Sequence, residues 1–161
     1  MYRGKSAMLM LAIFLLSLAA APPSLALTRS NQARGSANEE RLLSALDKSG
    51  YSYSKIDKGI WVIELDGKHL AKVKVIIAAT EDVVVVSAEV IDRKELKGKE
   101  AELVKMLELN DQYDTAKLAL SKRGLYARTD IHAGLVDGKE LAYLINQVAA
   151  LADDAYAQVK P

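Results

Sequence analysis

Cysteine is absent from the 161 residues of the sequence, which rules out disulfide bonds and a lipid-modified cysteine at the N-terminus. Only 2 histidines occur, His69 and His132, and no cysteine is present to complete a zinc site with them. The 9 glycines are scattered and form neither a Gly-x-Gly-x-x-Gly nor a P-loop pattern that would hold a phosphate. We therefore expect no metal ion and no cofactor, and we interpret both histidines as partly exposed strand residues.

Long hydrophobic runs are also lacking, except for residues 7–21, which carry no charge. Arg3 and Lys5 precede this run and Ala26 ends a short segment with small residues, so residues 1–26 predict a cleavable secretory signal peptide. A transmembrane anchor is the alternative, but about 15 apolar residues fall short of the roughly 20 that cross a bilayer. We expect an exported protein, in the periplasm or outside the cell, that keeps no stable membrane anchor after cleavage.

The chain has no excess of charge of either sign, with 22 lysines and arginines against 21 aspartates and glutamates. Cleavage after Ala26 removes Arg3 and Lys5, so 20 basic residues remain against the same 21 acidic ones, a net charge of −1. This balance gives no electrostatic reason to expect nucleic acid or an anionic membrane surface as a partner.

The chain that follows the predicted signal peptide has the length of one domain. Residues 27–37 are polar and aperiodic, which predicts a flexible leader, and residues 38–161 predict a single domain. Hydrophobic periods of 3.6 and 2, with turn residues between them, locate the elements of this domain. We expect helices over residues 38–49, 99–110 and 138–159, and strands over residues 51–57, 60–65, 68–79, 82–91, 115–121 and 125–131. The order α-ββββ-α-ββ-α predicts an α+β fold, in which three helices pack mainly on one face of an antiparallel sheet of five to six strands.

Four short segments follow one another in the second half of the chain, namely LELN at 107–110, AKLAL at 116–120, GLYARTD at 124–130 and ADDAY at 152–156. In this order they resemble the YbjN-like domain family, whose fold is similar to that of the type III secretion chaperones. The resemblance implies an α+β binding or regulatory module, and the similar chaperones act as dimers that hold extended segments of their partners. It implies no functional residues that can be carried over position by position. Those chaperones are cytoplasmic, whereas an export signal predicts that this protein acts outside the cytoplasm.

No group of residues in the sequence predicts catalysis. A serine hydrolase needs a nucleophile on a sharp turn with a base in reach, and no Gly-x-Ser-x-Gly occurs. Asp153 and Asp154 are adjacent carboxylates, but neighbours on a helix point about 100° apart and do not converge on one atom. We interpret this pair as part of a solvated helix face. We therefore expect a protein that is not an enzyme.

One predicted hairpin, residues 68–91, is apolar on both faces near its tip. One face is an ordinary core face that includes Ala71. The opposite face carries Ile76, Val83 and Val85, and Val62 of the preceding strand extends it. A strand that is apolar on both faces needs cover on both. We interpret Ile76, Val83, Val85 and Val62 as an interface for a second copy or for an extended protein segment; the alternative is that the leader, residues 92–98 or the second helix folds over them.

Three further expectations concern the same sheet. A tight turn at Thr80-Glu81 predicts that paired residues of the hairpin have numbers that sum to 161, which sets Lys74 opposite Ser87. Trp61 shares one face of its strand with Ile63 and Leu65, opposite to Val62 and Glu64, which predicts a core position. Arg128 and Asp130 fall on the outward side of the last strand, as an ordinary wet sheet face or as a polar recognition strip.

We therefore expect a non-enzymatic, extracytoplasmic protein-binding module, chaperone-like or regulatory, that forms a homodimer. The alternative is a binder of a small apolar ligand or lipid between the sheet and the C-terminal helix. Four alanines of that helix, Ala149, Ala150, Ala152 and Ala155, leave room for such a ligand.

Overall fold

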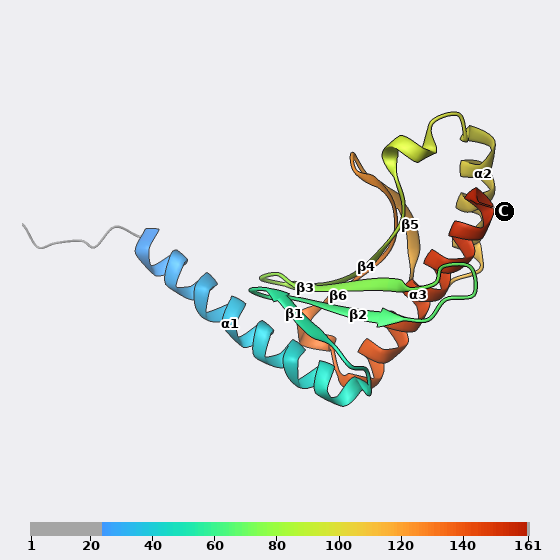
Figure 1. The fold of residues 1–161 in the computed structure, drawn as a ribbon. Coiled ribbons are helices and arrows are strands. Elements are labelled where there is room, and N and C mark those ends of the chain that lie inside the picture. The colour runs from blue at the N-terminus through green and yellow to red at the C-terminus, as the bar shows by residue number, and fades with distance from the viewer. Residues whose placement is uncertain (1–23, 161) are drawn as a thin grey trace, which may run out of the picture.

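A six-stranded antiparallel sheet forms the centre of the molecule in the computed structural model, which describes residues 24–160 (Figure 1). The predicted fold class, helix and strand order and α+β layering are confirmed. The elements are α1 Ser24–Ser49, β1 Ser54–Asp57, β2 Ile60–Leu65, β3 Val73–Ala79, β4 Val83–Asp92, η1 Arg93–Leu96, α2 Glu100–Glu108, η2 Leu109–Asp111, β5 Lys117–Leu120, β6 Gly124–His132, η3 Ala133–Leu135 and α3 Gly138–Val159.

The strands lie in the order β1-β2-β3-β4-β6-β5, and every neighbouring pair is antiparallel. Strands β1 to β4 form a meander, and β6 then pairs along nearly the whole of β4, so that β5 becomes the far edge. The rows of paired residues run straight across the sheet. Ile63, Val75, Ala88, Ala127 and Leu118 form one such row over five strands, and all five are buried.

Helices α1 and α3 pack together against one face of the sheet (Figure 1). The core between these layers includes Trp61, whose side chain is 2% exposed, so the predicted core position is confirmed. Helix α2 packs against α3 rather than against the strands. Asp137 caps α3, because its side chain accepts hydrogen bonds from the N–H groups of Lys139 and Glu140 at 2.8 and 2.9 Å.

Two predictions about the β3–β4 hairpin are wrong. The third strand begins at Val73 rather than Lys68, and Ala71 is exposed in the loop before it. The paired residues have numbers that sum to 163, so Ile76 and not Lys74 lies opposite Ser87. The turn is wider than expected because Thr80 and Val83 close it, through the Thr80 N–H and Oγ1 groups that both donate to the Val83 carbonyl at 2.9 Å. A shift of two in the sum leaves every side chain on its expected face.

Helix α1 begins at Ser24, whereas the sequence pattern placed the first helix from Asn38 and a flexible leader over residues 27–37. The sequence of residues 24–37 has no amphipathic stripe, but such a stripe indicates how a helix packs and is not needed for a helix to form. Leu25, Ala26 and Ala33 have good helix propensity without it. Most of the predicted signal peptide, residues 1–23, lies outside the described residues. Between residues 24 and 160, no helix combines the length and apolar character needed to cross a membrane.

Candidate functional site

Six apolar side chains lie together on the face of the sheet opposite α1 and α3. We call them the open-face patch: Ile60, Val62, Ile76, Ala78, Val83 and Val85, all half-buried. Val62 pairs with Ile76, and Ala78 pairs with both Ile60 and Val85, so the patch is continuous over β2, β3 and β4. The structure therefore brings the four predicted interface residues together, and Ala78 and Ile60 lie beside them.

The sequence left three segments that could fold over these residues, namely the leader, residues 92–98 and the second helix. Helix α2 packs on α3, and η1 lies at the far end of β4, where the Arg93 N–H donates to the Arg123 carbonyl at 2.7 Å. Asp92 lies seven positions after Val85 along the strand, roughly 23 Å away. Helix α1 reaches the hairpin through the Asn38 side chain, which donates to the Glu81 carbonyl in the β3–β4 turn. Thus neither α2 nor η1 is placed to cover the patch.

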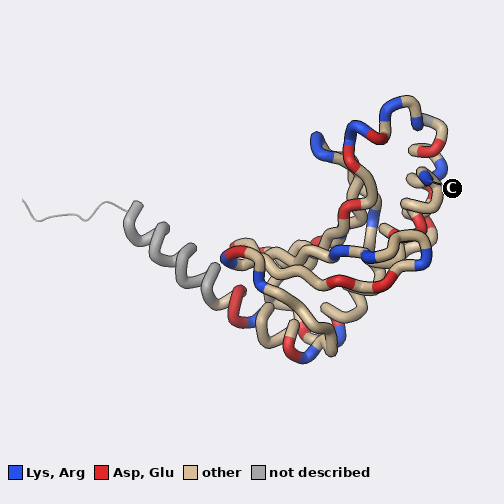
Figure 2. The backbone as a smooth tube through the Cα atoms, in the orientation of Figure 1, with Lys and Arg blue, Asp and Glu red and all other residues tan. Residues whose placement is uncertain are grey.

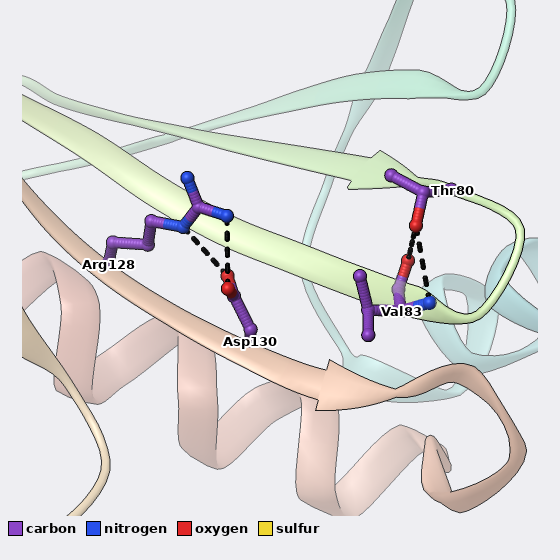
Figure 3. A network of polar contacts seen from close by, with 4 residues as sticks. All are labelled: Thr80, Val83, Arg128 and Asp130. Atoms are coloured by element: carbon purple, nitrogen blue, oxygen red, sulfur yellow. Dashed lines mark hydrogen bonds and ion pairs between the residues drawn. The ribbon is translucent and has the colours of Figure 1, made fainter.

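Charged pairs border the patch on two sides. Arg128 donates two hydrogen bonds to Asp130, at 2.7 and 3.0 Å, and both side chains lie on the sheet face turned away from α3 (Figure 3). The hydrogen bond to Asp130 raises the pKa of Arg128. Lys74 and Glu64 face each other across β2 and β3 at 3.4 Å. An apolar centre with a polar rim is the usual anatomy of a protein interface.

Each edge strand of the sheet carries a feature that hinders pairing with another strand. At β1 the register shifts between Lys55 and Asp57, and a lysine on such an irregular edge discourages further pairing. At β5 the Leu118 N–H donates to the Asn110 side-chain oxygen at 2.6 Å. Lys117 on the same strand donates to the carbonyl of Asn110, also at 2.6 Å. A polypeptide partner therefore has better access to the open face than to either edge.

A second polar site, which the sequence analysis missed, surrounds Asp153 on α3. Its carboxylate is 5% exposed and accepts hydrogen bonds from three consecutive N–H groups, those of Lys68 at 2.8 Å, His69 at 3.1 Å and Leu70 at 2.8 Å. Burial alone would raise the pKa of Asp153, but the three N–H groups outweigh it and hold the pKa below its ordinary value. The expectation that Asp153 lies on a solvated helix face is wrong.

Gly67 allows the loop to approach this carboxylate. A Cβ atom at Gly67 would lie 2.4 Å from Asp153 Oδ1 and 2.5 Å from the Leu70 carbonyl oxygen, so only glycine fits there. The sequence held one usable sign, since Asp153 lies four residues after Ala149 and so falls on the same side of α3 as that apolar residue.

His69, Asp153 and Asp154 each offer a ligand atom, and these atoms lie within 4.8 Å of one another. The oxygens of Asp153 are already occupied by the loop N–H groups. Asp154 accepts a hydrogen bond from the Tyr113 hydroxyl at 2.5 Å, and burial, together with this contact, raises the pKa of Tyr113. His132 lies elsewhere, at the end of β6, where its Nδ1 accepts from the Gly134 N–H at 3.1 Å. We interpret Asp153 and Asp154 as structural residues that hold two loops against α3.

A cavity of about 310 Å³ lies between the β2–β3 loop and α3. Its lining includes the polar residues Asp66, Lys68, Asn146 and Asp153, together with Ala149 and Ala150. Ala152 and Ala155 are instead fully buried in the core. Two of the four alanines thus fill space in the core, and the other two line a cavity in which apolar residues, among them Leu65 and Val73, alternate with these polar groups.

In comparisons with known proteins, no family model and no curated protein sequence matches the chain.

Proposed function

We propose that this protein is a non-enzymatic, extracytoplasmic binding module that holds an apolar polypeptide segment on the open-face patch. The observation that carries the proposal is a continuous set of half-buried apolar side chains over three neighbouring strands, on the face opposite the packed helices. Exported status rests on the sequence of residues 1–26.

Three features of the site support a polypeptide as the ligand. The patch is a broad sheet face, which suits an extended chain better than a small molecule. The pairs Arg128–Asp130 and Lys74–Glu64 supply a polar border around it. The protected edges direct a partner to this face. A chaperone-like role, as the resemblance to the YbjN-like family implies, fits such a surface.

Binding of a permanently unfolded polypeptide tests the proposal. Reduced, carboxymethylated α-lactalbumin, labelled with a fluorophore, should raise its anisotropy when the mature chain is added. Ile76→Lys combined with Val85→Lys should abolish this binding. Contact with an apolar segment would remove water from two lysine charges, which is costly. Leu135→Lys is the matched control, since Leu135 is 71% exposed on η3 and its replacement should leave binding unchanged.

A milder variant guards against loss of the fold. Val62→Thr combined with Val85→Thr keeps side-chain shape and should weaken binding while the circular dichroism spectrum stays that of the wild type. Equal binding by the wild type and both patch variants would refute the proposal. Sedimentation of the same proteins tests the expected homodimer, in which a second copy would cover the patch until a client displaces it.

A further inference from the structure

Basic residues gather at the end of the sheet where β4 passes into η1 and where β5 turns into β6 (Figure 2). We call these five exposed residues the basic end: Arg93, Lys94, Lys97, Lys122 and Arg123. Two chain segments meet there, because the Arg93 N–H donates to the Arg123 carbonyl. The near-zero net charge of the whole chain conceals this local excess of positive charge.

The acidic residues of the same segment are engaged with other groups. Asp92 accepts a hydrogen bond from the Lys94 N–H at 2.8 Å and so caps η1. Glu95 pairs with Lys160 at 2.6 Å. Among the described side chains, no acidic partner lies within ion-pair distance of the five residues of the basic end. Their charges are therefore available to a ligand.

The basic end is continuous with the open-face patch along two strands. Strand β4 runs from Val83 in the patch to Asp92, and β6 runs from Gly124, next to the basic end, to His132 beside the patch. The sheet curves so that this end rises on the side away from α1 (Figure 1). Burial and Glu89 raise the pKa of Tyr126, while the positive charge of Arg123 opposes the rise, so Arg123 lies near this open-face side chain.

A shallow, open depression lies at the basic end and is lined by Arg93, Leu120, Ser121 and Lys122. Leu120 is 52% exposed there, so the depression offers one apolar contact between two positive charges.

We infer that the basic end selects clients whose apolar segment is flanked by acidic residues. The inference rests on the proposed function, since the same client would lie on the open-face patch and extend along β4 and β6. Seven to nine residues of extended chain, roughly 23 to 30 Å, span the distance from the patch to the basic end. Paired positive and negative surfaces contribute specificity and faster association.

Three labelled peptides test this inference on the mature full-length chain. They share one apolar segment and carry four aspartates, four serines or four lysines after it. The aspartate peptide should bind at least about tenfold more tightly than the serine peptide at low salt, and the preference should shrink at high salt. Lys122→Glu combined with Arg123→Glu should remove the preference and leave binding of the serine peptide unchanged.

A matched charge variant and lipid vesicles serve as controls in the same binding experiment. Lys48→Glu combined with Lys139→Glu makes the same charge change elsewhere on the surface and should keep the preference. Equal affinity of the wild type for all three peptides would overturn the inference, as would a preference that survives the Lys122 and Arg123 variant. The inference also fails if phosphatidylglycerol vesicles bind through the basic end while the peptides show no preference. Failure of the serine peptide to respond to Ile76→Lys with Val85→Lys would instead contradict the proposed function.

Discussion

At the scale of single residues, Asp153 fastens the β2–β3 loop to α3. A buried carboxylate is costly unless hydrogen bonds replace its water, and three consecutive N–H groups of the β2–β3 loop do so here. The bond pattern also fixes the loop on α3, which in turn sets where β3 begins. The residue that looked like part of a solvated pair is thus a structural anchor.

Replacement of Asp153 by asparagine should lower the free energy of unfolding by about 2 kcal/mol or more. The asparagine NH₂ group would face a backbone N–H group, so at least one buried donor would lose its acceptor. Urea denaturation followed by circular dichroism measures the change. Asp154→Asn, which alters only the half-buried contact to Tyr113, should cost about 1 kcal/mol or less, and equal losses for the two variants would contradict this account.

The same contacts predict a pH dependence. A carboxylate whose pKa is lower in the folded than in the unfolded chain stabilises the fold above its unfolded pKa, and this contribution is lost as the pH falls through the folded pKa. The ordinary value for Asp153 is 3.8, and the folded value is lower. The difference in unfolding free energy between the wild type and Asp153→Asn should therefore be constant above about pH 5 and should shrink below 3.8. A difference that stays constant down to pH 3 would show that the pKa of Asp153 is not lowered.

At the scale of elements, the two edge strands explain how a sheet with an open apolar face avoids pairing with other sheets. The irregular register of β1 and the side-chain cap of Asn110 on β5 each interrupt the row of free backbone groups. These devices protect the edges and leave the face available.

Asn110→Ala should make the β5 edge prone to aggregation, because the Leu118 N–H would become free to pair with another chain. We expect a loss of stability of about 1 kcal/mol or less and a clear rise in light scattering on incubation at elevated temperature. Asp111→Ala, on the same 3-10 helix, is the control and should scatter light like the wild type. Unchanged scattering of the Asn110 variant would show that the edge is protected by other means.

Most elements were predictable because local patterns determine them. Residues 60–65 and 138–159 were placed with the bounds that the structure has, since a regular apolar period and clear turn or cap residues enclose each of them. The start of β3 could not be predicted in this way. It depends on Asp153, 80 residues later than Val73, and such a long-range contact leaves no periodic trace in the sequence.

At the scale of the whole molecule, the candidate site was predictable only in part. Alternation along two strands was enough to group Ile76, Val83 and Val85 on one face, and pairing with β2 in the structure brings Val62 to them. The basic end escaped notice because net charge averages over the surface, whereas its residues come from two segments that only the fold joins. Composition therefore gives only the overall balance of charge, whereas the kind of partner depends on which charged residues the fold brings together.

The absence of native cysteine permits the most direct measurement of the central claim, that a polypeptide covers the open-face patch. A single thiol introduced by Val62→Cys can be alkylated by a fluorescent maleimide, at a protein concentration too low for self-association. Increasing amounts of reduced, carboxymethylated α-lactalbumin should slow this reaction until it saturates, while the reaction of Leu135→Cys keeps its rate. If both thiols react at rates that the unfolded polypeptide does not change, the open face is not the binding surface.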